Sequence, residues 1–152
     1  VTLDILVENM GRINFGPFLL QNKKGITGKV TLAGSVLESW DMFSLPFDKQ
    51  PLKKEVSNAV NRDAPMLKYA EFELKNLQDT YLDMRKWGKG VIWVNGHNLG
   101  KYWSIGPQQT IYLPAEWLKK GKNQVVVLDL LKTDQQFLTS LNKPILDQIN
   151  TR

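Results

Sequence analysis

Residues 87–130 read WGKGVIWVNGHNLGKYWSIGPQQTIYLPAEWLKKGKNQVVVLDL, and this stretch decides the fold of the chain. Its residues 91–94 form a short β-branched and aromatic run, which is typical of a buried strand. Asn95-Gly96 follows directly and suits a type I′ turn, because both central residues of that turn need a positive φ. The pattern therefore predicts a hairpin in which residues 99–103 return as the partner strand.

The second half of the same stretch predicts two more strands. A turn at Gly106-Pro107 leads to a strand over residues 110–113. Residues 114–118 begin with proline, which suits the first position of a helix, so a single helical turn is expected there. A turn over residues 121–123 then leads to a last apolar strand over residues 124–130.

Working outward, short strands alternate with turn residues along most of the chain. Residues 1–7 alternate apolar and polar side chains, which predicts a half-buried strand. Further predicted strands cover residues 26–32, 40–45, 66–74, 80–84 and, at an edge, 144–146, whereas residues 133–141 are ambiguous. Residues 46–65 contain three prolines and mixed charge, so an irregular surface connection is expected there, with a short helix within residues 52–60.

This series of short strands predicts an all-β fold, a jelly-roll β-sandwich. We expect one domain over residues 1–152, since the chain is long enough to bury a core and 42% of it is hydrophobic. The chain begins at Val1, inside an alternating pattern, so the domain is expected to be excised from a longer chain, with any targeting signal upstream.

The composition excludes several classes of function. The chain has no cysteine, which excludes disulfides, thiolate metal sites and a cysteine nucleophile. Its one histidine, His97, excludes a multi-histidine metal site. The net charge of +5 comes from lysines spread over turns, so no nucleic-acid partner is expected. No apolar run reaches the ~18 residues that indicate a membrane span, and we expect no cofactor and no metal.

Several motifs occur in one order along residues 1–130. They read LDILVEN (3–9), GRINFG (11–16), KGITG (24–28), TYLDM (80–84), WGKG (87–90), WVNGHNLGKYW (93–103) and GPQ (106–108). Together they resemble the C-terminal region of glycoside hydrolase family 35 β-galactosidases. The resemblance implies a galactose-binding-domain-like jelly roll, and it implies that the two catalytic glutamates lie in an N-terminal TIM barrel. Such a barrel takes ~250 residues, so no catalytic residue is carried over onto this chain.

The resemblance implies a function in carbohydrate metabolism. The chain would be a non-catalytic accessory domain of a β-galactosidase, a retaining glycosidase, and would not be an enzyme alone. Its partners would be the catalytic TIM barrel and sibling β-domains of the same polypeptide, and the family suggests a periplasmic or secreted location. One alternative is an autonomous carbohydrate-binding module that recognises galactose-containing glycans. Another is a generic adhesion or scaffold sandwich.

Five residues could form a lectin-like sugar site. Sugars pack their C–H groups on aromatic rings while their hydroxyls meet polar side chains. The residues that offer this combination are Trp103, Tyr102, Asn98, Trp87 and Arg12. The alternative, which we favour, is that the tryptophans are buried in the sandwich or against a neighbouring domain, since large aromatic side chains are more often buried than exposed.

A glycine-bracketed loop is the predicted interdomain interface. It contains Asn9, Gly11, Arg12 and Asn14 and offers a guanidinium fork and side-chain amides for recognition. An equal alternative is that these groups brace the loop internally.

The other polar residues favour structural roles. Glu71 and Glu73 share a strand face and cannot flank a sugar bond as two catalytic carboxylates must. Glu8 is expected to pair with Arg12 or with loop amides. His97 follows the turn directly, so we expect it at the top of the hairpin in solvent.

Overall fold

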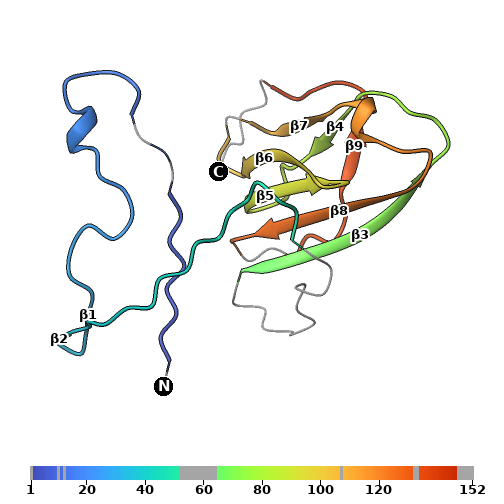
Figure 1. The fold of residues 1–152 in the computed structure, drawn as a ribbon. Helices are drawn as coiled ribbons and strands as arrows, with labels where there is room; N and C mark the ends of the chain where they lie inside the picture. The colour runs from blue at the N-terminus through green and yellow to red at the C-terminus, as the bar shows by residue number, and fades with distance from the viewer. Residues whose placement is uncertain are drawn as a thin grey trace. The chain divides into compact units, whose positions relative to one another are not determined.

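The computed structural model describes residues 2–9, 11, 13–51, 65–106, 108–131 and 134–146. The chain divides into two compact units, Val1–Ser44 (unit 1) and Leu45–Arg152 (unit 2), where the sequence predicted one domain over residues 1–152. The strands of both units are labelled in Figure 1, and each unit is described by itself.

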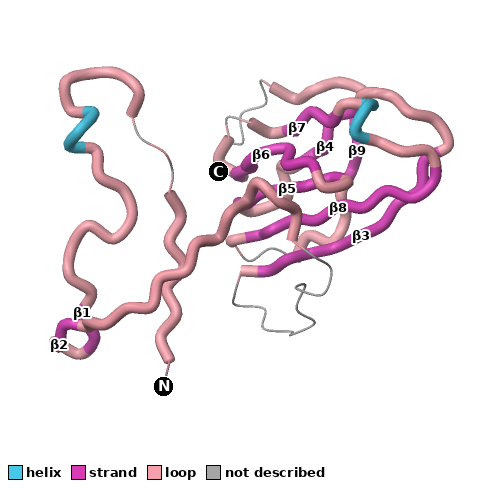
Figure 2. The backbone as a smooth tube through the Cα atoms, viewed as in Figure 1, coloured by secondary structure: helices cyan, strands magenta, loops and turns pink. Residues whose placement is uncertain are grey.

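Unit 1 has very little regular structure. It contains the 3₁₀ turn η1 (Leu19–Gln21) and a small hairpin of β1 (Thr31–Leu32) and β2 (Ser35–Val36). Ala33 and Gly34 connect these strands with φ angles of 48° and 85°, the positive values that a type I′ turn needs. Figure 2 draws almost all of this unit as loop. No described side chain of unit 1 is fully buried.

Three strand predictions in unit 1 were wrong or too long. Residues 2–7 and 40–45 form no strand, and only Thr31–Leu32 remains of the strand predicted over residues 26–32. The alternating pattern is present in the sequence, but a strand also needs a neighbour to accept and donate its backbone hydrogen bonds. The described residues of unit 1 provide such a neighbour only within the β1–β2 hairpin.

Unit 2 is a sandwich of two antiparallel sheets. The strands are β3 (Met66–Leu74), β4 (Thr80–Asp83), β5 (Lys89–Val94), β6 (His97–Trp103), β7 (Thr110–Leu113), β8 (Gly121–Asp129) and β9 (Thr139–Leu141). One sheet has the order β3-β8-β5-β6 and the other has the order β7-β4-β9. The 3₁₀ turn η3 (Ala115–Trp117) follows β7, as the proline pattern predicted. The predicted all-β sandwich is confirmed.

The β5–β6 hairpin has the predicted turn and an unpredicted bulge. Asn95 and Gly96 have φ angles of 49° and 91°. Ile92 pairs with Gly100 and Trp93 pairs with Asn98, so Leu99 is an extra residue in β6. A bulge of this kind reverses the faces on which the following side chains lie. Asn98 therefore lies on the outer face of the sheet and Tyr102 on the inner face.

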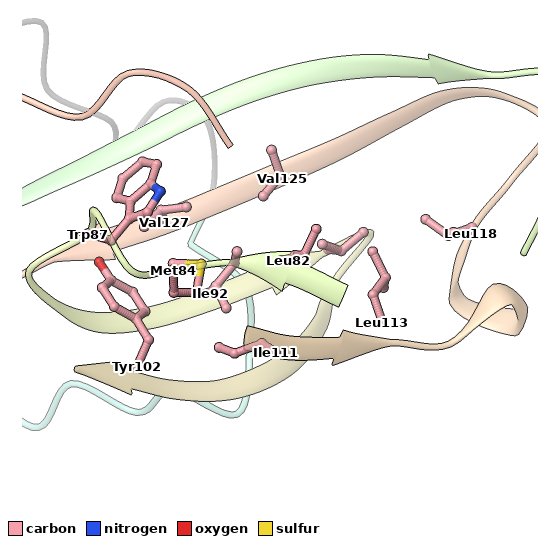
Figure 3. Close-up of a cluster of buried hydrophobic side chains, with 11 residues drawn as sticks. Leu82, Met84, Trp87, Ile92, Tyr102, Ile111, Leu113, Leu118, Val125 and Val127 are labelled. Atoms are coloured by element: carbon pink, nitrogen blue, oxygen red, sulfur yellow. The ribbon is translucent and has the colours of Figure 1, made fainter. Parts of the chain in front are cut away.

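The main core fills the space between the two sheets. Ile92, Val94 and Val127 contribute from one sheet, and Leu82 and Ile111 contribute from the other. In Figure 3 the side chains of Ile92, Val127, Leu82 and Ile111 lie between the two sheets, with Trp87 and Tyr102 at one end of the core and Leu118 at the other.

A second, smaller core covers the outer face of the four-stranded sheet. Val91, Trp93 and Val126 are fully buried there, with Phe47 packed against them. The Phe47 ring meets the Trp93 ring edge-on, with centroids 5.8 Å apart, and the Trp93 Nε1 donates to the Phe47 carbonyl at 3.2 Å. Gln50 adds a second tie, since its Oε1 accepts from the Gly96 N–H at 2.8 Å. The helix predicted within residues 52–60 lies outside the described residues.

The end of the chain differs from the prediction. The ambiguous region 133–141 provides β9, which pairs with β4. The edge strand predicted at residues 144–146 is wrong, because the Ile145 N–H donates to the Thr110 hydroxyl at 3.1 Å instead of joining a ladder. Within the described part of the chain, no helix is long and apolar enough to cross a membrane.

Candidate functional site

Two of the five predicted sugar-site residues lie in the core of unit 2. Trp87 is 4% exposed and Tyr102 is 2% exposed. Their rings pack edge to face, with centroids 6.3 Å apart and an angle of 76° (Figure 3). This burial agrees with the alternative that the aromatic side chains close the sandwich, and it leaves no open ring face for a sugar.

The hydroxyl of Tyr102 ties β6 to the middle of the sheet. It donates to the Leu128 carbonyl at 3.0 Å, across the backbone of Gly90. A Cβ on Gly90 would lie 1.7 Å from the Leu128 oxygen and 2.9 Å from the Tyr102 hydroxyl, so only glycine fits here. Burial, together with the negative charge of Asp129, raises the pKa of Tyr102. The phenol therefore stays protonated and serves as a hydrogen-bond donor.

A lysine bridges the buried carboxylate and the indole. Lys68 Nζ lies 3.6 Å from Asp129 Oδ2 and 5.0 Å from the centre of the Trp87 ring. It also donates to the Gln135 carbonyl at 2.9 Å. A buried carboxylate needs such a partner, because an isolated charge in the interior is costly. This cluster secures the end of β3 and β8.

The other two described sugar-site residues lie on the outer face of the same sheet. Asn98 donates from its amide to the Phe47 carbonyl and accepts from the Gly100 N–H at 2.7 Å. Trp103 is half-buried, and Lys89 Nζ lies 4.1 Å from the centre of its ring. Arg12 lies outside the described residues. The structure thus places Trp87 and Tyr102 inside and Asn98 and Trp103 outside, and their role in sugar binding stays a prediction.

His97 tops the hairpin and is exposed. Its ring stacks on Trp117, with centroids 4.7 Å apart and an angle of 9°. Below it, Asn95 Nδ2 donates to the Trp117 carbonyl and to Asn123 Oδ1, each at 2.8 Å. The side-chain oxygen of Asn95, Oδ1, accepts from the Gln124 N–H at 3.0 Å. These amides lock the hairpin to the β7–β8 connection.

The predicted interface loop is exposed where it is described. Asn9, Gly11 and Asn14 are all exposed. The Gly11 N–H donates to Asn9 Oδ1 at 2.9 Å, a local side-chain turn, and Gly11 has a φ of 82°. This bond favours internal bracing of the loop. Its role as an interdomain interface stays a prediction.

Sequence reasoning missed a pair of tyrosines on the outer face of the three-stranded sheet. Tyr81 and Tyr112 are partners in the β4–β7 ladder, and their ring centroids are 5.5 Å apart at an angle of 45°. The signal was available, since Leu82, Ile111 and Leu113 alternate with them and point into the core.

Carboxylates flank the tyrosine pair. Asp79 Oδ2 accepts from the Tyr112 hydroxyl at 2.8 Å, and its Oδ1 accepts from the Ala115 N–H at 2.9 Å. The bond from the Ala115 N–H contributes most to lowering the pKa of Asp79, and the bond from Tyr112 adds to it. The same bond to Asp79 raises the pKa of Tyr112. Asp83 accepts from Arg85 Nε at 3.0 Å and Nη2 at 2.7 Å, and these bonds lower the pKa of Asp83. Among the described residues, no three metal-binding side chains gather.

Comparison with known proteins matches each unit to a known domain family. Residues 1–46 match the family model "Beta-galactosidase, first all-beta domain". Residues 65–123 match the family model "Beta-galactosidase, galactose-binding domain".

Curated relatives agree with these matches. Beta-galactosidase 17 of Arabidopsis thaliana is 42% identical over 85% of this chain and 21% of its own length. Beta-galactosidase-1-like protein 2 of Homo sapiens is 39% identical over 84% of the chain and 21% of its own length. Beta-galactosidase 1 of Dictyostelium discoideum is 34% identical over 95% of the chain and 23% of its own length. The chain thus spans about a fifth of the length of these relatives. The predicted resemblance is confirmed, and the chain belongs to the β-galactosidase family, in the region of its β-domains.

Proposed function

We propose that this chain is a non-catalytic accessory region that packs on, and supports, the catalytic TIM barrel of a family 35 β-galactosidase. Unit 1 would pair with a sibling β-domain of the same polypeptide, and unit 2 would brace the assembly as a rigid sandwich. The parent activity would be retaining hydrolysis of terminal β-galactosyl groups.

One observation carries this proposal: unit 1 exposes large apolar side chains that a lone domain would bury. Phe15 is 89% exposed and Leu20 is 93% exposed, and Met42 and Phe43 are also largely exposed. Large apolar side chains exposed in this number are typical of a surface that a partner covers. The match of residues 1–46 to an all-β domain model supports a partner sheet that completes it.

The arrangement of carboxylates in unit 2 supports a non-catalytic role. Glu71 and Glu73 lie two positions apart in β3, so they share one face of one strand. The Tyr69 hydroxyl donates to Glu71 at 2.7 Å, which gives that carboxylate a structural partner. A retaining glycosidase needs two carboxyl groups on opposite sides of the bond, about 5 Å apart.

A chimera tests the proposal. These 152 residues would replace the matching segment of Beta-galactosidase 17 of Arabidopsis thaliana. We expect the chimera to hydrolyse p-nitrophenyl β-galactoside and the chain alone to be inactive. The combined variant Phe15→Ser, Leu20→Ser and Phe43→Ser should shorten the thermal half-life of the chimera at least several-fold.

The matched control is Phe137→Ser, which changes an exposed aromatic side chain of unit 2. It should leave the half-life of the chimera unchanged. Equal half-lives for the triple variant and the parent chimera would show that unit 1 packs against nothing, and activity of the chain alone would contradict its non-catalytic role.

A further inference from the structure

The two outer faces of the unit 2 sandwich differ in what covers them. Phe47 packs over the face that carries Val91, Trp93 and Val126. The outer face of the β7-β4-β9 sheet instead presents Tyr81, half-buried, and Tyr112, which is 46% exposed. A pair of aromatic rings on this second face needs a physical explanation, because the solvated face of an antiparallel sheet usually carries polar side chains.

The tyrosine rings lie in a row across the sheet. Tyr81 pairs with Tyr112 on one side and with Leu141 on the other, so the three side chains stand on neighbouring strands. Neighbouring strands are about 4.8 Å apart, which agrees with the 5.5 Å between the ring centroids. The row is therefore a continuous aromatic and apolar strip.

Asp79 holds the exposed ring in position. One carboxylate oxygen accepts from the Tyr112 hydroxyl, and the other accepts from the Ala115 N–H at the start of η3. A ring fixed in this way loses little conformational entropy when a ligand binds, and such preorganisation strengthens binding.

Hydrogen-bonding groups border the rings. Asp83 stands two positions after Tyr81 and shares its face of β4, with Arg85 bound to its carboxylate. Carboxylate oxygens accept hydrogen bonds from hydroxyl groups, and a guanidinium donates hydrogen bonds to hydroxyl oxygens. The surface thus combines ring faces with acceptors and a donor at their edges, which is the chemistry that a sugar recognises.

The size of the face argues against a protein as its occupant. The four-residue strands β4 and β7 are about 13 Å long, and β9 is one residue shorter. Three strands span roughly 10 Å, so the face covers at most on the order of 130 Å². A stable protein interface buries about 800 Å² on each partner. The Ile145 N–H meets the Thr110 hydroxyl at one border, which limits the face further. A single small ring fits this area, whereas a protein partner would need a much wider surface.

We propose that Tyr81 and Tyr112, flanked by Asp79 and Asp83, form a platform for a pyranose sugar on the outer face of the β7-β4-β9 sheet. The C–H face of the ring packs on Tyr112 and Tyr81, and the hydroxyls bond to the carboxylates. The platform is shallow, so its affinity lies in the millimolar range. This sugar platform does not depend on the packing role that we propose for unit 1.

The test is a ¹H–¹⁵N titration of the full 152-residue chain with methyl β-D-galactopyranoside. We expect saturable shifts in the backbone amides of residues 80–83 and 110–113. Tyr112→Ala and Tyr81→Ala should each weaken binding at least fivefold. Tyr112→Phe keeps the ring and removes the bond to Asp79, so it should weaken binding only two- to threefold.

The spectrum of each variant reports whether it is folded, and Tyr112→Phe keeps the test valid if an alanine variant unfolds. His97→Ala is the matched control, since it removes an exposed aromatic ring from the other sheet, and it should bind like the parent chain. Shifts centred on His97, Trp117 or Trp103, or no shift at tens of millimolar sugar, would overturn the proposal. So would self-association in sedimentation that Tyr112→Ala abolishes, because the face would then bind protein.

Discussion

Units 1 and 2 are both rich in apolar and aromatic residues, yet unit 1 exposes these side chains and unit 2 buries them. In unit 1, Phe15 and Leu20 are about nine-tenths exposed, whereas in unit 2 Ile92 and Trp93 are 0% exposed. The difference does not come from the pattern, because residues 1–7 alternate as regularly as β3 does. It comes from pairing: β3 has β8 as a partner along all nine of its residues, and residues 2–7 form no ladder within the described chain. An apolar pattern thus makes a core only where a second strand and a second layer meet it.

The largest contrast should appear when one aromatic side chain is removed from each unit. Trp93→Ala leaves a cavity in the second core and breaks the bond to Phe47, so it should cost about 3–5 kcal/mol of unfolding free energy. Phe15→Ala removes an exposed ring and should change stability by less than about 0.5 kcal/mol. Urea unfolding of both variants checks this, and comparable losses would show that unit 1 has a core after all.

A matched pair of glycines sharpens the comparison. Gly90→Ala would bring a Cβ to 1.7 Å from the Leu128 oxygen, and backbone cannot yield as a flexible side chain can. We expect a loss of about 3 kcal/mol, at the upper end of overpacking. Gly28 in unit 1 has nothing within 4 Å of an added Cβ, so Gly28→Ala should be neutral. A neutral Gly90→Ala, measured by thermal unfolding, would mean that β5 and β8 can separate without cost.

Two asparagines make a third pair. Asn123 is buried and bonds to Asn95, Lys119 and Gly121, so Asn123→Ala should cost about 2 kcal/mol by leaving buried groups unpaired. Asn22 in unit 1 accepts one bond from the Ile13 N–H at 3.3 Å, and Asn22→Ala should have no measurable effect on the urea midpoint. The reverse order of the two losses would place the main polar network in unit 1.

The smallest expected effect is electrostatic. Bonds from Arg85 lower the pKa of Asp83, so the ionised carboxylate stabilises unit 2 above the unfolded-state pKa of about 3.9. That contribution, roughly 0.2–1 kcal/mol for a partly exposed pair, is lost as the pH falls through the lower folded-state pKa. Asp83→Asn should therefore reduce the difference between the urea midpoints at pH 6 and pH 3. An unchanged difference would assign the acid sensitivity to other groups.

The sequence predicted unit 2 far better than unit 1. The strand predictions for residues 66–74 and 110–113 agree with β3 and β7 at both ends, because alternation and turn residues act locally and the partner strands are present. The type I′ turn at Asn95-Gly96 was predictable for the same reason. In unit 1 the missing information is the partner, which no local pattern supplies.

The sugar-site prediction depended on a single residue of register. Alternation along β6 would place Asn98 and Tyr102 on the same face, since they are four residues apart. The bulge at Leu99 puts Asn98 outside and Tyr102 inside. Gly100, which follows Leu99 and has a φ of 112°, is the one signal of that bulge, since an isolated glycine within a strand pattern suggests one. The glycine alone does not say which neighbouring residue is the extra one, so the faces were not assigned from the sequence. The tyrosine pair, by contrast, follows from plain alternation in β4 and β7.

The Asn95-Gly96 turn also bears on how the protein ages. In an open chain, the backbone nitrogen of the glycine attacks the side-chain amide carbon of the asparagine and releases ammonia. Water then opens the resulting succinimide to aspartate or isoaspartate. Here Gln50 holds the Gly96 N–H, and three hydrogen bonds hold the Asn95 side chain. The fold therefore protects this turn, which should deamidate only when the hairpin opens. Peptide mapping after weeks at pH 8 should find isoaspartate at Asn95 in chain kept in urea and none in the folded protein.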